Sequence, residues 1–137
     1  MRKTPTCAGH RTRTQTTRSQ EREVPPGNDR LDEERSALAA DLIGAQRKEC
    51  WRNAVMALLV DPALSEGVYV ESYAAWPTGL RLPVHHGWVE LPDGTVVDPT
   101  AHVVGHGAPT FYRGAVFTAA QVKQYALTER RTLPLAD

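Results

Sequence analysis

The chain has 137 residues, 41% of them hydrophobic, and its 16 basic side chains balance 16 acidic ones. This length allows one small domain, and the composition excludes a collagen-like or wholly disordered protein. A net charge of zero supplies no overall attraction to nucleic acid, and no apolar stretch approaches the roughly 20 residues that a membrane-spanning helix needs.

The N-terminus and the cysteines indicate the compartment. The N-terminal segment is polar and arginine-rich and lacks the apolar stretch of a secretory signal. Two cysteines, Cys7 and Cys50, are too few for a disulfide framework, and we expect no function for Cys7. We therefore expect a cytoplasmic protein whose cysteines are reduced and which does not contact a membrane.

Residues 1–30 predict a disordered basic tail. They carry seven basic and three acidic side chains, a net charge of +4, with almost no large apolar residue. Such a segment buries too little surface to offset its conformational entropy. A solvated tail is favoured over an arm that weakly contacts nucleic acid or protein, because the segment has no aromatic residue to stack on a base. Residues 31–137 are expected to form a single compact domain.

Two helices are predicted next. The first begins near residue 30, where Leu31, Leu38, Leu42 and Ile43 recur near the helical period and acidic residues fill the first turn. Gly44 lies near its end. The second helix covers residues 50–59 and is apolar on several sides, so it should be buried. The dipeptide Asp61-Pro62 ends it, because the residue before a proline disfavours the helical conformation.

The sequence then becomes β-like. Residues 68–74, 83–91 and 95–98 predict three strands, and residues 113–117 a fourth. Thr118 is expected to cap a terminal helix that ends near Leu127. Helices followed by an antiparallel sheet and another helix predict an α+β fold, with a buried helix packed on a small sheet.

Cys50 stands at the predicted start of the buried helix. The positive end of the helix dipole stabilises a thiolate there, which lowers the pKa of a thiol and makes it nucleophilic. A cysteine nucleophile also needs a base and an acceptor that orients the base. His85, His86 and Asp98 on adjacent strands offer both. The alternative is that Cys50 is a small buried hydrophobic residue, as unpaired cysteines often are.

The hairpin between two of these strands discriminates between the histidines. A three-residue loop at residues 92–94 puts His86 and Asp98 on one face as diagonal neighbours, about 7–8 Å apart. A two-residue loop at residues 93–94 would put His85 there instead, because the register shifts by one. Pro-Asp-Gly fits the longer loop better, so we assign His86. The implied cross-strand pairs are Leu91–Thr95 and Trp88–Asp98.

Three segments together resemble the transglutaminase-like superfamily, a branch of the papain-like cysteine enzymes. They are Cys50-Trp51-Arg52-Asn53-Ala54, His86-Gly87-Trp88-Val89-Glu90 and Asp93-Gly94-Thr95-Val96-Val97-Asp98-Pro99-Thr100. The chain order of a helix-start Cys, a strand His and a strand Asp followed by Pro-Thr is that of the family, in the compact form of small bacterial and phage proteins. The resemblance covers about residues 46–117. It implies a papain/transglutaminase-like core with Cys50 as nucleophile, His86 as general base and Asp98 as the orienting residue.

This triad predicts an enzyme that acts on an amide or other acyl group of a peptide, a protein or a small molecule, with no cofactor. Hydrolysis would make it an amidase, protease or deamidase, and transfer to an amine would make it transglutaminase-like. The backbone amide of Cys50 and the side chain of Gln46 are candidates to hold the oxyanion, and Asn53 to brace the site. The alternative is a non-catalytic binding module that keeps the papain-like fold.

Other residues carry weaker signals. Trp51 and Trp88 are expected either to line the cleft or to belong to the core. A zinc site at His102 and His106 is not expected, because Gly105 and the residues after it break the helix that such a spacing needs. No metal is therefore predicted, and the roles of His85, His102 and His106 stay open.

Overall fold

The computed structural model describes residues 30–77, 82–127 and 133–136. Residues 1–29 of the expected basic tail lie outside the described residues. Arg30 belongs to the fold, because its carbonyl oxygen accepts a hydrogen bond from the Val96 amide at 2.8 Å. Backbone pairing with Val96, which composition does not reveal, holds Arg30 in place.

Within the described residues, five strands form one antiparallel sheet: β1 (Val68–Ala75), β2 (Val84–Glu90), β3 (Val96–Val97), β4 (Thr110–Phe111) and β5 (Ala115–Thr118). β1 is central, with β2 on one side and both β4 and β5 on the other. β3 pairs with β2 at the edge, in register Val89–Val97. The helices are α2 (Glu33–Ile43), α3 (Cys50–Val60), α4 (Pro99–Val104), α5 (Ala119–Leu127) and a short 3-10 helix, η2 (Pro62–Leu64).

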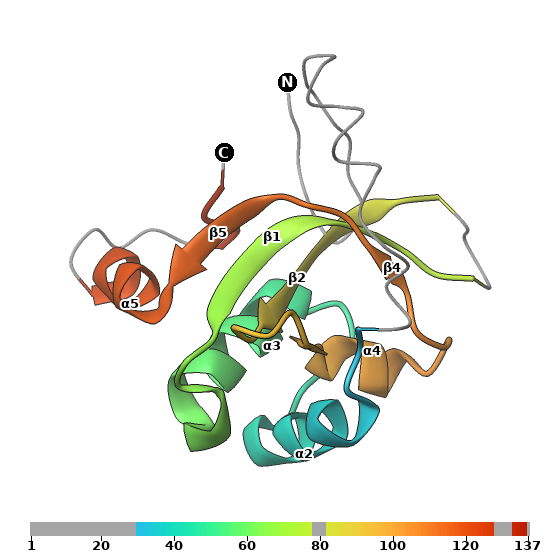
Figure 1. Cartoon of the computed structure of the whole chain (residues 1–137), viewed down its shortest axis with the longest axis horizontal. Helices are drawn as coiled ribbons and strands as arrows, with labels where there is room; N and C mark the ends of the chain where they lie inside the picture. Colours follow the sequence, from blue (N-terminus) through green and yellow to red (C-terminus); the bar gives the residue numbers. More distant parts are fainter. Residues whose placement is uncertain (1–29, 78–81, 128–132, 137) are drawn as a thin grey trace, which may run out of the picture.

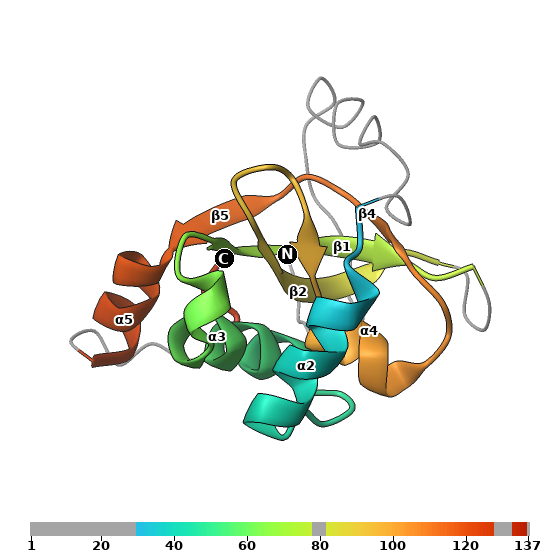
Figure 2. The same ribbon diagram turned by 60° about the horizontal axis from the view of Figure 1, so that its bottom comes forward.

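The helices divide unequally around the sheet. α2, α3 and α4 lie together on one side, and α5 lies beside β5 (Figures 1 and 2). This helices-plus-antiparallel-sheet arrangement is the predicted α+β class. No helix in the described part of the chain has the length and apolar composition to cross a membrane.

α3 is buried, as its all-round apolar sequence predicts. Ala54, Ala57 and Leu58 form a core with Tyr69 of β1 and Val89 of β2. Alternate residues of a strand point to opposite faces, so Trp88 points away from α3. It belongs to a second apolar cluster, whose buried members are Val70, Ala74, Trp88, Val96 and Phe111. The sheet thus has two distinct buried faces.

In α2, the hydrophobic period predicts the helix but not which of its residues are buried. Asp32 is its N-cap, accepting a hydrogen bond from the Arg35 amide at 2.9 Å, and Gly44 ends it with a positive φ of 66°. The helix is therefore where we expected it. Leu38 and Leu42, however, are 62% and 54% exposed, and the buried face consists of Ser36, Ala39 and Ala40. Small residues face inward because α2 packs closely against α3 and α4.

α4 is a six-residue helix in a segment where we expected a loop. The Asp98 carboxylate caps it by accepting from the Ala101 amide, Pro99 takes the first helical position, and Gly105 ends it at φ 73°. These are ordinary start and stop signals. Gly105 therefore breaks the helix between His102 and His106, as expected, although His102 itself lies in α4. At the other end of the chain, the predicted Thr118 cap is present: its Oγ1 accepts from the Gln121 amide at 3.1 Å.

Candidate active site

The hairpin between β2 and β3 has the predicted three-residue loop. The Leu91 amide donates to the Thr95 carbonyl at 2.8 Å, and Gly94 takes the positive φ of 91° that the loop requires. The following pairs, Glu90–Val96 and Val89–Val97, continue the same register. This register aims His86, rather than its neighbour in sequence, toward Asp98.

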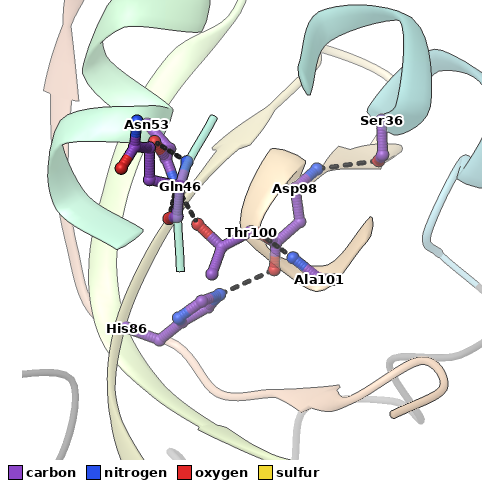
Figure 3. Close-up of polar contacts among 7 residues, drawn as sticks. All are labelled: Ser36, Gln46, Asn53, His86, Asp98, Thr100 and Ala101. Atoms are coloured by element: carbon purple, nitrogen blue, oxygen red, sulfur yellow. Dashed lines mark hydrogen bonds and ion pairs between the residues drawn. The ribbon is translucent and has the colours of Figure 1, made fainter. Parts of the chain in front are cut away.

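His86 and Asp98 form a buried hydrogen-bonded pair. His86 Nε2 lies 2.7 Å from Asp98 Oδ2, and the two side chains are 1% and 0% exposed (Figure 3). An ionised carboxylate only accepts hydrogen bonds, so Nε2 carries the proton and donates it. Nδ1 then holds the ring's lone pair. It is the nitrogen that remains to take a proton from a nucleophile, as a general base must.

Asp98 is fixed at every polar atom. Its second oxygen, Oδ1, accepts from the Ala101 amide at 3.1 Å, and its own amide donates to Ser36 Oγ at 2.9 Å (Figure 3). The first contact ties the carboxylate to the start of α4, and the second ties the backbone to α2. A carboxylate held in this way cannot swing away from His86, so the imidazole keeps one orientation.

Two indole rings enclose the imidazole. The Trp76 ring meets His86 edge-on with centroids 5.0 Å apart, and the Trp88 ring stacks on it at 5.9 Å. Trp88 also belongs to the second apolar cluster. The rings keep water away from the His86–Asp98 hydrogen bond, which strengthens it.

Asn53 links the loop before α3 to the start of α4. Its side-chain amide donates to the Gln46 carbonyl at 2.8 Å and to Thr100 Oγ1 at 2.8 Å, while its oxygen accepts from the Gln46 amide at 3.2 Å (Figure 3). Asn53 lies one turn after Cys50, and Thr100 lies two residues after Asp98. These bonds therefore join the first turns of α3 and α4.

A second contact brings the start of α3 to β2. A Cβ on Gly87 would lie 2.9 Å from Trp51 Cδ1 and 3.3 Å from Trp51 Cα. Only glycine permits this approach, because any other side chain would push the helix away. Trp51 and Gly87 are the sequence neighbours of Cys50 and His86. The helix start and the histidine strand are thus in direct contact at the expected place.

Cys50 is the first residue of α3 and is fully buried. The side chain of the N-cap residue, Glu49, makes no capping hydrogen bond to this helix start. The structure holds Cys50 in a disulfide bond, and no cysteine of the described residues is a free thiol. The expectation of reduced cysteines is therefore wrong for this structure. A helix start stabilises the thiolate form of a cysteine. The thiolate is also the form that takes part in disulfide exchange.

Gln46 occupies the loop before Cys50, but its backbone, not its side chain, makes the observed contacts. The residue is exposed and lines a hollow of about 380 Å³ together with Asn53 and Arg52. An oxyanion role for its side chain stays a prediction. Lys48, with a positive φ of 65°, turns the chain into the helix two residues before Cys50.

The remaining histidines lie elsewhere. The His85 ring contacts the Tyr73 ring at a tilt of 54°, with centroids 4.5 Å apart, on the sheet face opposite His86. His102 is exposed on α4 and His106 follows the glycine that ends it. Across residues 30–77, 82–127 and 133–136 there is no group of three His, Cys, Asp or Glu side chains that could hold a metal ion.

Three residues of the site had no role assigned from the sequence. Thr100 belongs to the Asp-Pro-Thr motif, so its position near Asp98 could have been predicted from the sequence. Trp76 directly follows β1, but nothing in its local pattern shows that it contacts His86. Ser36 sits in a helix where serine carries no signal of its own, and only the packing of α2 on α4 reveals its role.

Comparison of the chain with protein-family models, with curated proteins and with solved structures finds no match in any of the three.

Proposed function

We propose that this chain is a cysteine-dependent acyl-transfer or hydrolytic enzyme with a papain/transglutaminase-like core and the triad Cys50, His86 and Asp98. The observation that carries the proposal is the buried His86–Asp98 hydrogen bond at 2.7 Å. The residue after His86, Gly87, packs against Trp51 in the first turn of α3, the helix whose first residue is Cys50. A carboxylate that orients an imidazole next to a helix-start thiol is the arrangement that nucleophilic cysteine chemistry needs.

The reaction follows from these groups. His86 Nδ1 takes the proton of the Cys50 thiol, and the resulting thiolate attacks the carbonyl carbon of an amide. The carbon–sulfur bond forms, the carbon–nitrogen bond breaks, and the imidazolium gives its proton to the leaving amine. Water or a second amine then attacks the thioester, loses its proton to His86 and releases the Cys50 thiolate. The backbone N–H of Cys50, at the start of α3, is the candidate to hold the oxyanion.

The active form in this scheme is the reduced form. A sulfur in a disulfide is not a thiolate and cannot attack a carbonyl. The disulfide-bonded state of Cys50 is therefore inactive by this mechanism. Reduction by a dithiol or phosphine regenerates the thiol. The proposed substrates are peptides, proteins or small molecules with an amide or acyl group.

A panel of peptide amides and acyl donors, assayed with reduced full-length protein, tests the proposal. We expect turnover that Cys50→Ala and His86→Ala lower by at least about 1,000-fold, since nucleophile and base act as one unit. His85→Ala is the matched control, because this adjacent histidine points to the other face of β2; it should keep activity within about threefold of wild type. Turnover that survives Cys50→Ala, or equal losses in both histidine variants, would contradict the proposal.

A second candidate function is binding without catalysis. The observation that favours it is Cys50 itself, fully buried and held in a disulfide. In that case the reduced thiol would react with iodoacetamide no faster than an ordinary cysteine, and His86→Ala would leave its rate unchanged. Faster alkylation at pH 6 that depends on His86 would exclude it.

A further inference from the structure

The disulfide of Cys50 has only one candidate partner in the chain. The sequence contains two cysteines, Cys7 and Cys50, and the structure is that of a single chain. Cys50 is disulfide-bonded, so its partner sulfur is that of Cys7, which lies outside the described residues. The sequence alone indicates no function for Cys7. The disulfide connects it to the residue that we propose as the nucleophile.

The N-terminal segment joins the domain close to the candidate site. The Arg30 carbonyl accepts a hydrogen bond from the Val96 amide at 2.8 Å, and Val96 is two residues before Asp98. The 22 residues between Cys7 and Arg30 are able to span up to roughly 75 Å when extended. The length of this segment is therefore no obstacle to a bond between Cys7 and Cys50.

The sequence around Cys7 suits a bond to a buried sulfur. Cys50 is fully buried at the start of α3. The two Cα atoms of a disulfide lie within about 7 Å of each other, so the partner segment has to approach the domain closely. The neighbours of Cys7 are the small residues Thr6, Ala8 and Gly9, and side chains of this size permit a close approach.

We propose that the Cys7–Cys50 disulfide is a redox switch that holds the enzyme in a latent form. This inference rests on the proposed function and adds the regulation of that site. In the oxidised form Cys50 has no thiolate, and the segment that carries Cys7 obstructs the approach of a substrate to it. Reduction frees the nucleophile and its surroundings together.

A dithiol supplies the two electrons that reduction needs. One thiolate of the dithiol attacks the Cys7 sulfur, because the Cys50 sulfur is buried. The bond between the two cysteine sulfurs breaks, and Cys50 leaves as a thiolate. The second thiol of the dithiol loses its proton and attacks the mixed disulfide. Cys7 leaves and takes up that proton, and the dithiol becomes a cyclic disulfide.

The position of Cys50 favours its role as the leaving group. A helix start stabilises the thiolate form of a cysteine, and a thiol that forms a stable thiolate leaves a disulfide quickly. The same property that makes Cys50 a nucleophile in the reduced form therefore makes the bond easy to reduce. We expect a dithiol to open it without unfolding the domain.

Peptide mapping tests the bond without reference to activity. Full-length protein is incubated with glutathione disulfide, unfolded in iodoacetamide and digested with trypsin without reductant. We expect the peptides of residues 4–11 and 49–52 to appear as one linked species, which dithiothreitol separates. Cys7→Ser should abolish the link, and Thr6→Ser, which keeps both thiols, is the matched control and should retain it. Two alkylated or glutathionylated cysteines, or a disulfide-linked dimer, would overturn the inference.

Turnover assays separate the switch from the proposed function. With the panel of peptide amides and acyl donors, oxidised wild-type protein should be at least about 100-fold slower than the same protein after dithiothreitol, because its thiolate is blocked. Thr6→Ser should keep this dependence. Cys7→Ser that has not been exposed to oxidant should need no dithiothreitol and should match reduced wild type within about twofold, since its triad is unchanged.

The two assays together distinguish the two failures. Turnover that depends on Cys50, in protein whose mapping shows no link to Cys7, would overturn the switch and leave the cysteine mechanism standing. A link that forms, with no turnover in either redox state, would support the disulfide and contradict the catalytic proposal.

Discussion

Two buried carboxylates on opposite faces of the sheet region have different kinds of partner. Asp98 is bonded to the imidazole of His86 and to the start of α4. Glu71, on the α3 face of β1, accepts hydrogen bonds from the Tyr69 hydroxyl and from the Leu135 and Ala136 amides. Both carboxylates are therefore satisfied, as buried charges must be. The two carboxylates differ in whether their hydrogen-bond partners can gain or lose a proton near neutral pH.

The partners of Glu71 keep their protons at any physiological pH. Burial, and then the charge of Glu71, raise the pKa of Tyr69 far above its ordinary value, and backbone amides do not titrate. Imidazole is the side chain whose charge ordinarily changes between pH 5 and 8. A carboxylate bound to an imidazole can support proton transfer, whereas a carboxylate bound to amides and a locked phenol only holds the chain together. Glu71 therefore anchors the C-terminal residues, and Asp98 is assigned to chemistry.

Asp98→Asn should give the largest effect, on activity. Asparagine caps helices as well as aspartate, so α4 should remain and the free energy of unfolding should change by no more than about 1 kcal/mol. The neutral amide no longer fixes the tautomer of His86 or stabilises its imidazolium form, so kcat should fall by about 100-fold or more. Steady-state kinetics with reduced protein and urea unfolding measure both. Unchanged kcat in a folded variant would mean that Asp98 is structural.

Glu71→Ala should show the opposite pattern. Three hydrogen-bond donors lose their acceptor, so the free energy of unfolding should fall by about 3 kcal/mol, while kcat per folded molecule stays within about twofold. Urea unfolding and activity at low temperature measure the two quantities. Glu66→Ala, which removes an exposed glutamate, is the control and should change stability by less than about 0.5 kcal/mol. A selective loss of kcat in Glu71→Ala would contradict the division between the two carboxylates.

The raised pKa of Tyr69 predicts a pH dependence of stability. The folded pKa lies above the unfolded value of about 10, so the contribution of the neutral hydroxyl is complete below pH 10 and is lost as pH rises beyond it. Near pH 7, Tyr69→Phe should lower the free energy of unfolding by about 1–2 kcal/mol, and this difference should shrink above pH 10. Urea unfolding of both proteins from pH 7 to 11 measures it. A constant difference would show that Tyr69 titrates normally.

Ser36→Ala should give the smallest effect. The buried Asp98 amide loses its acceptor, at a cost of about 1 kcal/mol in the free energy of unfolding. The contacts of Oδ1 and Oδ2 remain, so kcat should fall by less than about tenfold. Ser65→Ala, at an exposed serine, is the matched control for both measurements. A loss of kcat as large as that of Asp98→Asn would show that the backbone tie, not the carboxylate, sets the histidine geometry.

Local sequence signals were enough to predict part of the fold and the His86–Asp98 pair. The loop at residues 92–94 has one well-fitting turn type, and a turn fixes the register of the strands on both sides of it. That is why His86, not His85, could be matched to Asp98 before any coordinates. The burial of α3 followed in the same way from its apolar composition, because such a helix has no polar face to expose.

Other features depend on packing that no local pattern contains. The leucines of α2 suggested its core face, yet small residues face inward because neighbouring helices approach closely. α4 had recognisable caps at Asp98 and Gly105, but its six residues are too few to show a hydrophobic period. The contact between Trp76, which follows β1, and His86 of β2 depends on the tertiary structure alone. The disulfide state of Cys50 depends on redox conditions rather than on sequence pattern.

The most direct test is the pH dependence of Cys50 alkylation in reduced protein, on a Cys7→Ser background so that one thiol reports. If His86 and the helix start activate Cys50, the rate should stay high down to about pH 6 or below, because the thiolate persists well under the ordinary cysteine pKa of about 8.5. His86→Ala should move the midpoint toward that ordinary value, and His85→Ala should not. A midpoint near or above 8.5 in the parent protein, unchanged by His86→Ala, would contradict the cysteine–histidine–aspartate account.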